Sequence, residues 1–300
     1  MTQLLALIKR NVKLYFKDKG LCFTSLITPI ILLVLYCTFL SNVYEDSFRG
    51  AVETAGMSVS DKLINGTVAG QLVSSLLAVC CVTVAFNSNM LMVQDKLTGA
   101  RRDIMMSSVK SRTLAMGYFI ANMLSTLLVW GIAAAAGLVY MYFSGWFMTF
   151  ADVMFLLLDV VLLSLFGSVL SSLINCFISS NGQMTAVGTI ISAGYGFICG
   201  AYMPVSQFSD GLQKAISFLP GTYGTSLLRN HTLRGIFEEM GNAGFPTEVI
   251  DGIKDSIDCN VYFFDDKVGI SAMYMILGIS VLVLLALYIP IGMMLGKKQK

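Results

Sequence analysis

The chain has 300 residues, of which 56% are hydrophobic and 13% are charged, and its formal net charge is +2. A mean hydropathy of +0.74 and apolar runs of about 20 residues match the hydrocarbon thickness of a bilayer. These values exclude a soluble globular protein and indicate an integral membrane protein. Because lipid leaves unpaired backbone groups without water, and because the runs do not alternate with period two, the spans are predicted to be helices.

We expect an all-α polytopic fold, a single transmembrane domain over residues 1–300. The six spans are predicted at residues 21–40, 68–93, 114–143, 153–174, 186–203 and 268–295. An even number of spans places both termini on the same side of the membrane.

Residues 1–19 are predicted to form a basic amphipathic helix at the membrane interface. Leu4, Ile8 and Val12 recur at helical spacing, and basic residues occupy the remaining surface. A helix of this kind lies flat among anionic headgroups. The alternative is an ordinary basic flank of the first span. The apolar run that follows is too long for a cleaved signal peptide.

Charge is distributed unequally between the two sides of this predicted topology. Residues 1–19 carry five basic and one acidic residue, residues 95–112 five and two, and the last four residues three and none. On the other side, residues 45–62 carry two basic and four acidic residues, and residues 204–267 five and nine. Since basic residues are retained in the cytoplasm, both termini are predicted to be cytoplasmic.

The segment 94–112 interrupts the apolar sequence between spans two and three with seven charges. A short helix here, joined directly to two spans, would be a stiff lever that a cytoplasmic partner could move. Its mixed polar and apolar residues suit docking, although solvated loop charges and membrane anchors would give the same composition. The candidate docking residues are Asp95, Gly99, Arg101, Arg102, Asp103, Ile104 and Met105.

Several polar or small residues inside the spans are candidates for a translocation pathway or gate. Asp159 is the one ionisable residue well inside an apolar span, and the spans offer no basic partner for it, so it is expected to contact substrate, a subunit interface or water, or to be protonated. Asn87 and Asn122 could line a pathway, but hydrogen bonding between helices is the favoured explanation. Tyr195 and Gly196 lie in a thin, glycine-rich span that suits a gate, and helix packing explains them equally well.

The long segment 204–267 is predicted to lie outside the cell, with short re-entrant helices followed by a cap. Pro204, Pro220 and Tyr223 are the candidate residues of the exit region. Residues 228–267 are acidic and have too few apolar residues for a large independent core, so we expect a small helical cap over the exit.

The sequence does not carry the parts of an enzyme active site. The seven cysteines fall mostly in apolar spans, and the single histidine, His231, is expected on the outer loop, so neither a metal site nor a histidine-activated nucleophile is predicted. No Gly-x-x-x-x-Gly-Lys-Ser/Thr loop is present to bind nucleotide phosphates. The chain is therefore expected to bind no cofactor itself, and no nucleic-acid partner is expected.

The chain resembles the membrane subunits of ABC-2 type exporters. The segment after span two is similar to that family's cytoplasmic coupling helix, with Ala100 and Val109 in the places of the common threonine and proline. The stretches 200–204 and 219–223 resemble the end of the family's fifth span, and residues 1–19 resemble its interfacial elbow helix.

This resemblance implies one half of an export pathway in the inner membrane. A second identical or related subunit would meet this chain through spans near two and five, and cytoplasmic ATPase subunits, which hold ATP and Mg, would dock on the coupling helices. The substrate would be hydrophobic or amphipathic, such as a drug, antibiotic, peptide or lipid. The alternatives are a membrane sensor or scaffold that recruits a cytoplasmic protein, and a secondary transporter.

Overall fold

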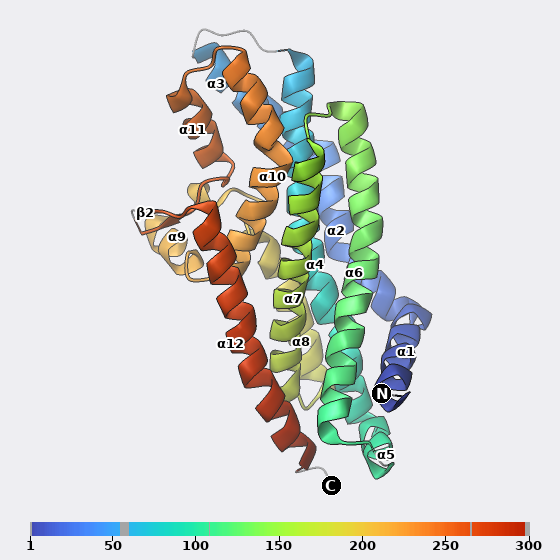
Figure 1. The fold of residues 1–300 in the computed structure, drawn as a ribbon. Helices are drawn as coiled ribbons and strands as arrows, with labels where there is room; N and C mark the ends of the chain where they lie inside the picture. The colour runs from blue at the N-terminus through green and yellow to red at the C-terminus, as the bar shows by residue number, and fades with distance from the viewer. Residues whose placement is uncertain (1, 55–59, 108, 265, 298–300) are drawn as a thin grey trace.

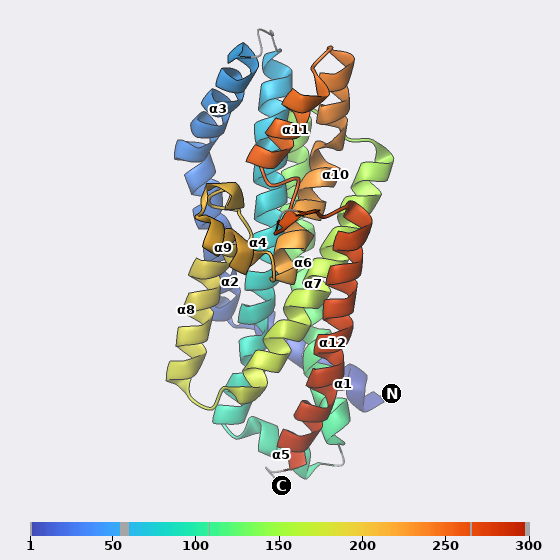
Figure 2. The ribbon, with the colours of Figure 1, turned by 90° about the vertical axis from the view of Figure 1, so that its left-hand side faces the viewer.

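The structure, a computed structural model, describes residues 2–54, 60–107, 109–264 and 266–297. Long helices run roughly side by side in an elongated bundle (Figures 1 and 2). The first half of the chain contains α1 (Thr2–Lys17), α2 (Lys19–Leu35), the π-helical turn η1 (Tyr36–Leu40), α3 (Ser41–Thr54), α4 (Asp61–Leu97), α5 (Ala100–Met106) and α6 (Ser111–Ser144). The second half contains α7 (Phe150–Phe177), α8 (Asn181–Ile198), the 3-10 turn η2 (Val205–Gln207), α9 (Asp210–Ile216), α10 (Pro220–Asn242), α11 (Thr247–Ser256), β1 (Tyr262–Phe263), β2 (Asp266–Lys267) and α12 (Ile270–Lys297).

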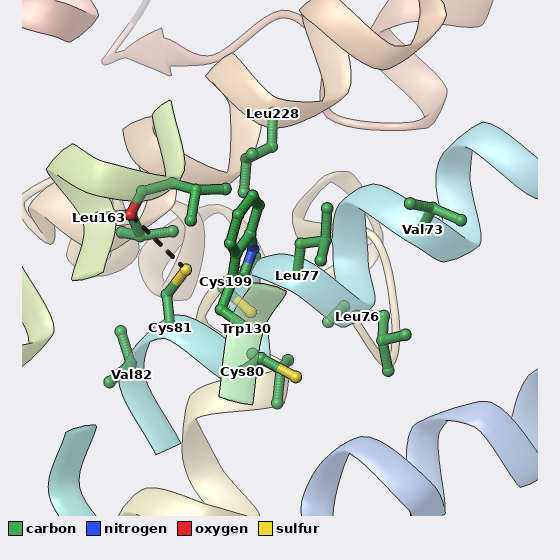
Figure 3. Close-up of a cluster of buried hydrophobic side chains, with 14 of the residues drawn as sticks. Val73, Leu76, Leu77, Cys80, Cys81, Val82, Trp130, Leu163, Cys199 and Leu228 are labelled. Carbon is green, nitrogen blue, oxygen red and sulfur yellow. Dashed lines mark hydrogen bonds between the residues drawn. The ribbon is translucent and has the colours of Figure 1, made fainter. Parts of the chain in front are cut away.

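The longest helix, α4, is the centre of the bundle. It packs against α2, α6, α7, α8 and α10, and every residue from Gly66 to Asn89 is buried. Its side chains meet Trp130 of α6, Leu163 of α7 and Leu228 of α10 in the main hydrophobic core (Figure 3). This enclosure leaves the middle of α4 without a surface for a second subunit, which differs from our expectation that span two lies at the subunit contact.

Five helical stretches among the described residues are long and apolar enough to cross a membrane. They are 19–50, 61–97, 111–144, 150–177 and 270–292. They confirm five of the predicted spans and extend the first one through η1 and into α3, to Gly50. The prediction at 186–203 corresponds to α8 and the turn after it. Because Asn181, Gln183 and four glycines lower its hydropathy, α8 does not meet the same standard, and the count of six spans stays a prediction.

The two ends of the bundle differ in the elements they contain. The start of α1, the whole of α5 and the last turn of α12 lie at one end, and α3, α11 and the end of α10 lie at the other (Figures 1 and 2). This arrangement agrees with the prediction that the two termini and the segment 94–112 share one side. The predicted amphipathic helix is present as α1, which packs on α6 and buries Leu7, Asn11 and Tyr15.

The segment between α8 and α12 is built differently from the predicted cap. Short helices are present in it, as expected, but α10 runs within the bundle and packs on α4, α7 and α12. Only the outer part forms a separate small core, in which Phe48, Ile64, Phe237 and Ile253 come from four different helices. The antiparallel pair β1–β2 is a second departure, since the fold was predicted to be entirely helical.

Candidate functional site

The candidate docking element is α5, the short helix between α4 and α6. Gly99 precedes it with a φ of +85°, a left-handed conformation that favours glycine. An added Cβ would have no neighbour within 4 Å, so the constraint at Gly99 is its backbone conformation and not crowding. This residue ends α4 and lets α5 turn across the end of the bundle.

The two faces of α5 have different surroundings. Arg101 and Met105 are buried, and Met105 shares an apolar cluster with Leu7 of α1 and Tyr288 of α12. The opposite face exposes Arg102, Asp103 and Met106, with Met106 82% exposed, while Ile104 is partly buried. The exposed face of α5, defined as Arg102, Asp103 and Met106, is therefore a small mixed polar and apolar surface on a helix fixed to the bundle.

Asp95 was expected on the docking surface, but the structure places it inside the protein. Its side chain is 7% exposed and accepts two hydrogen bonds from Arg10, of 2.6 and 2.9 Å, and one of 2.6 Å from the hydroxyl of Tyr118. The reason is that α4 stays helical through Leu97, which keeps Asp95 on a covered face of α4. The carboxylate holds α1 and α6 against α4 and is not exposed for a partner.

Asp159 was predicted to lack a basic partner, and the structure corrects this. Its carboxylate lies 2.6 Å from Nδ1 of His231 and accepts a hydrogen bond of 2.5 Å from the hydroxyl of Tyr274. The ring of Phe155 stacks on His231 at 5.1 Å between centroids. His231 belongs to α10 and not to an outer loop, so this cluster joins α7, α10 and α12.

The asparagines considered for a pathway lie between helices. Asn122 of α6 donates a hydrogen bond of 3.1 Å to Oγ of Ser171 on α7, and Asn89 of α4 donates one of 2.9 Å to Ser172. Asn87 is also buried, and its Nδ2 forms no hydrogen bond with the described residues. The contact of Asn122 supports the favoured explanation, which is hydrogen bonding between helices, whereas for Asn87 that explanation stays a prediction.

The gate and exit candidates lie in and between α8 and α10. Tyr195 lies against Gly221, and the ring of Tyr202 covers Gly196. Pro204 directly precedes η2, and Pro220 is the first residue of α10, where its missing N–H costs nothing. The hydroxyl of the buried Tyr223 donates a hydrogen bond of 2.6 Å to the carbonyl of Ser217, so the short helix α9 is tied to α10.

A buried ion pair fastens this region to the rest of the bundle. Arg229 of α10, 1% exposed, donates to Asp258 at 3.2 Å and to the carbonyl of Gly200 at 2.5 Å. Asp258 also accepts hydrogen bonds from the backbone N–H groups of Val205 and Ser206, of 2.7 and 3.3 Å. Gly200 has a φ of +69°, and an added Cβ would lie 2.5 Å from the Asp258 carboxylate, so only glycine fits.

One family profile matches most of the chain. The profile of the ABC-2 family transporter protein matches residues 51–288. The chain belongs to the ABC-2 family. No curated protein and no solved structure matches the chain.

As an ABC-2 permease, the chain is a component of membrane transport and not itself an enzyme. The matched residues include α5, the cluster around Asp159 and the pair of Arg229 and Asp258. Helix α1 and the whole first span, 19–50, precede the match, and the contact between Arg10 and Asp95 joins α1 to the matched part.

Three basic residues with a structural role were missed by reasoning from the ABC-2 sequence alone. Arg10 was assigned to the headgroup surface, and His231 and Arg229 were assigned to an outer segment. One signal was available: Asp159 is a carboxylate in an apolar span, and such a group needs a partner. The partner lies 72 residues away in sequence, and no local pattern indicates that distance.

Proposed function

We propose that this ABC-2 permease is the membrane subunit of an exporter in the inner membrane, which moves a hydrophobic or amphipathic substrate outward. Separate ATPase subunits, which hold ATP and Mg, dock on α5, and a second copy or a related permease completes the pathway. The exposed face of α5 supports this proposal most directly. Arg102 and Asp103 offer charge-assisted hydrogen bonds to a partner, and Met106 offers an apolar anchor.

The attachment of α5 explains how force would reach the spans. Met105 packs in the same cluster as residues of α1, α6 and α12, and Lys96 donates a hydrogen bond of 2.7 Å to the carbonyl of Ile178 at the end of α7. A partner that moves α5 would therefore displace several helices together, because packed elements move as units. ATP binding between the ATPase subunits would tilt these helices, and hydrolysis would reset them.

The test begins with the tagged chain, purified in mild detergent from its native membrane. Mass spectrometry should find a P-loop ATPase at about one copy per permease. In the variant Arg102→Glu/Asp103→Arg/Met106→Asp we expect at least about a tenfold loss of the co-purified ATPase. The reversed charges on α5 would repel the charges of the partner that the native residues attract, and the apolar anchor Met106 is removed.

The matched control exchanges one pair of charges on α9, away from α5 (Figure 2). Asp210→Lys/Lys214→Asp on α9 likewise changes exposed charged residues, here with no change in net charge, and it should retain the ATPase. An ATPase retained equally by both variants would show that α5 is not the docking element. A permease that never recovers an ATPase would favour a sensor, a scaffold or a secondary transporter.

A further inference from the structure

A cavity of about 690 Å³ lies near the end of the bundle opposite α5. Its walls come from the end of the first span, from α4, from residues 202–207 and from α11. This volume is within the range of about 300–1,000 Å³ that is usual for small-molecule sites. Most of the wall is apolar, with Phe39, Val43, Met203, Val249 and Ile253 among the lining residues.

One lining residue is polar and buried and makes no hydrogen bond of ordinary geometry. Gln71 of α4 is 1% exposed, and neither the nitrogen nor the oxygen of its amide is within normal hydrogen-bonding geometry of a described residue; its polar neighbour is the hydroxyl of Tyr44, which lines the same cavity. Leaving a buried amide unpaired costs free energy, so such groups in native proteins need an explanation. An amide offers both a donor and an acceptor, which suits a ligand hydroxyl or amide.

The absence of charge from the cavity wall indicates which class of ligand it suits. None of the described residues that line the cavity is charged, so an ionic headgroup would enter without a counter-charge, which is unfavourable in an apolar site. The wall is also held in place, because Asp258 binds the backbone of Val205 and Ser206, next to the lining residues Pro204 and Gln207.

We propose that this cavity binds a neutral amphipathic molecule, with its apolar part between α3, α4 and α11 and a hydroxyl or amide hydrogen-bonded to Gln71. The site lies within a single chain and does not need a second subunit to complete it. The inference rests on the proposed function, since it names the chemical class of the transported molecule.

The probe is a monoacylglycerol with a photoreactive diazirine in its acyl chain, added to the purified full chain in detergent, with unlabelled monoacylglycerol as competitor. Competed labelling should map to peptides of α3, α11 and residues 202–207. Gly252 lines the cavity, and its added Cβ would meet nothing within 4 Å, so Gly252→Phe adds a ring at the wall from a backbone position that tolerates a side chain. It should reduce competed labelling at least tenfold, whereas Gly241→Phe, at an equally open position outside the cavity, should not.

Gln71→Leu tests the polar anchor separately. It keeps the size of the side chain and removes the amide, so affinity for the monoacylglycerol should fall about tenfold with the lost hydrogen bonds. The ligand-free protein should melt at the same temperature or higher, because an unpaired amide is no longer buried. A purely structural Gln71 would instead lower the melting temperature and leave the affinity unchanged.

Three results would overturn the proposal: no competed labelling, competed labelling that Gly252→Phe does not reduce, or equally strong binding of a fatty acid with the same acyl chain and an ionised carboxylate. Neither measurement requires an ATPase. A permease that docks its ATPase on α5 but shows no competed labelling would refute the cavity alone. Labelling without ATPase docking would refute the proposed exporter instead.

Discussion

At the scale of single residues, the buried carboxylates are matched to basic residues on other elements. Four aspartates with side chains at most 7% exposed each contact a basic residue that is distant in sequence. The pairs are Asp95 with Arg10, Asp152 with Arg234, Asp159 with His231 and Asp258 with Arg229. A buried pair adds little net stability, but removing one partner is costly, so these contacts determine which helices meet.

The contact between Asp159 and His231 gives a testable stability difference. His231→Ala leaves Asp159 with one hydrogen-bond donor, Tyr274, and should lower the free energy of unfolding by about 2–3 kcal/mol. Asp159→Asn keeps an acceptor for Tyr274 and should cost about 1 kcal/mol. Both values can be measured by unfolding in mixed micelles.

The control for this comparison is an ion pair on the surface of α10. Glu238 contacts Arg234 at 2.7 Å, but its side chain is 55% exposed, so Glu238→Ala should cost less than about 0.5 kcal/mol. If His231→Ala cost no more than Glu238→Ala, the contact with Asp159 would have no role in holding α7 and α10 together.

At the scale of helices, the sequence predicted the elements whose signal is local. Long apolar runs indicated α2, α4, α6, α7 and α12, and the charged segment 94–112 between two of them indicated the short helix α5. The part of α10 from Leu228 onward was assigned to a cap because the segment 228–267 is acidic and has few apolar residues. Its polar groups are satisfied by α7, by residues near 200 and by the turn after α11, and these partners cannot be identified from the local sequence.

Helix α1 depends on one such long-range contact. Arg10→Ala would leave the buried carboxylate of Asp95 with Tyr118 as its hydrogen-bond donor. We expect the free energy of unfolding to fall by about 2 kcal/mol, which is less than for a fully buried pair because the Arg10 side chain is 32% exposed. We expect α1 to detach more often, which would raise the rate of trypsin cleavage after Lys13 at least about tenfold.

A neighbouring substitution distinguishes the loss of this ion pair from the loss of a positive charge. Lys9→Ala removes an exposed charge from the same helix and should leave cleavage after Lys13 unchanged. Asp95→Asn in the Arg10→Ala background should restore part of the protection, because the unpaired buried charge is removed. Equal cleavage of Arg10→Ala and Lys9→Ala would mean that the contact does not hold α1.

At the scale of the whole molecule, the unequal charge of the sequence corresponds to two structurally different ends. The basic segments 1–19 and 95–112 lie together at the end that contains α5 (Figure 1). The acidic segments contribute α3, α10 and α11 toward the opposite end, and α9 near the middle of the bundle's length (Figure 2). Because basic residues are retained in the cytoplasm, this arrangement supports an orientation with α5 inside the cell and α11 outside.

Labelling of introduced cysteines from one side of the membrane would test this orientation. Asp103→Cys on α5 and Glu248→Cys on α11 both replace exposed residues. On intact cells with a permeable outer envelope, an impermeant maleimide should label only Glu248→Cys, and Asp103→Cys should react after the membrane is opened.

The unmodified chain sets the background of this experiment, and we expect that background to be low on the outer side. Burial raises the pKa of Cys259, which lies just after α11, to about 12, so at pH 7.5 fewer than about one in 10,000 of its thiols is ionised and reactive. Labelling of Asp103→Cys alone would reverse the orientation and place α5 out of reach of a cytoplasmic ATPase. Labelling of both variants on intact cells would contradict the separation of α5 and α11 at opposite ends of the bundle.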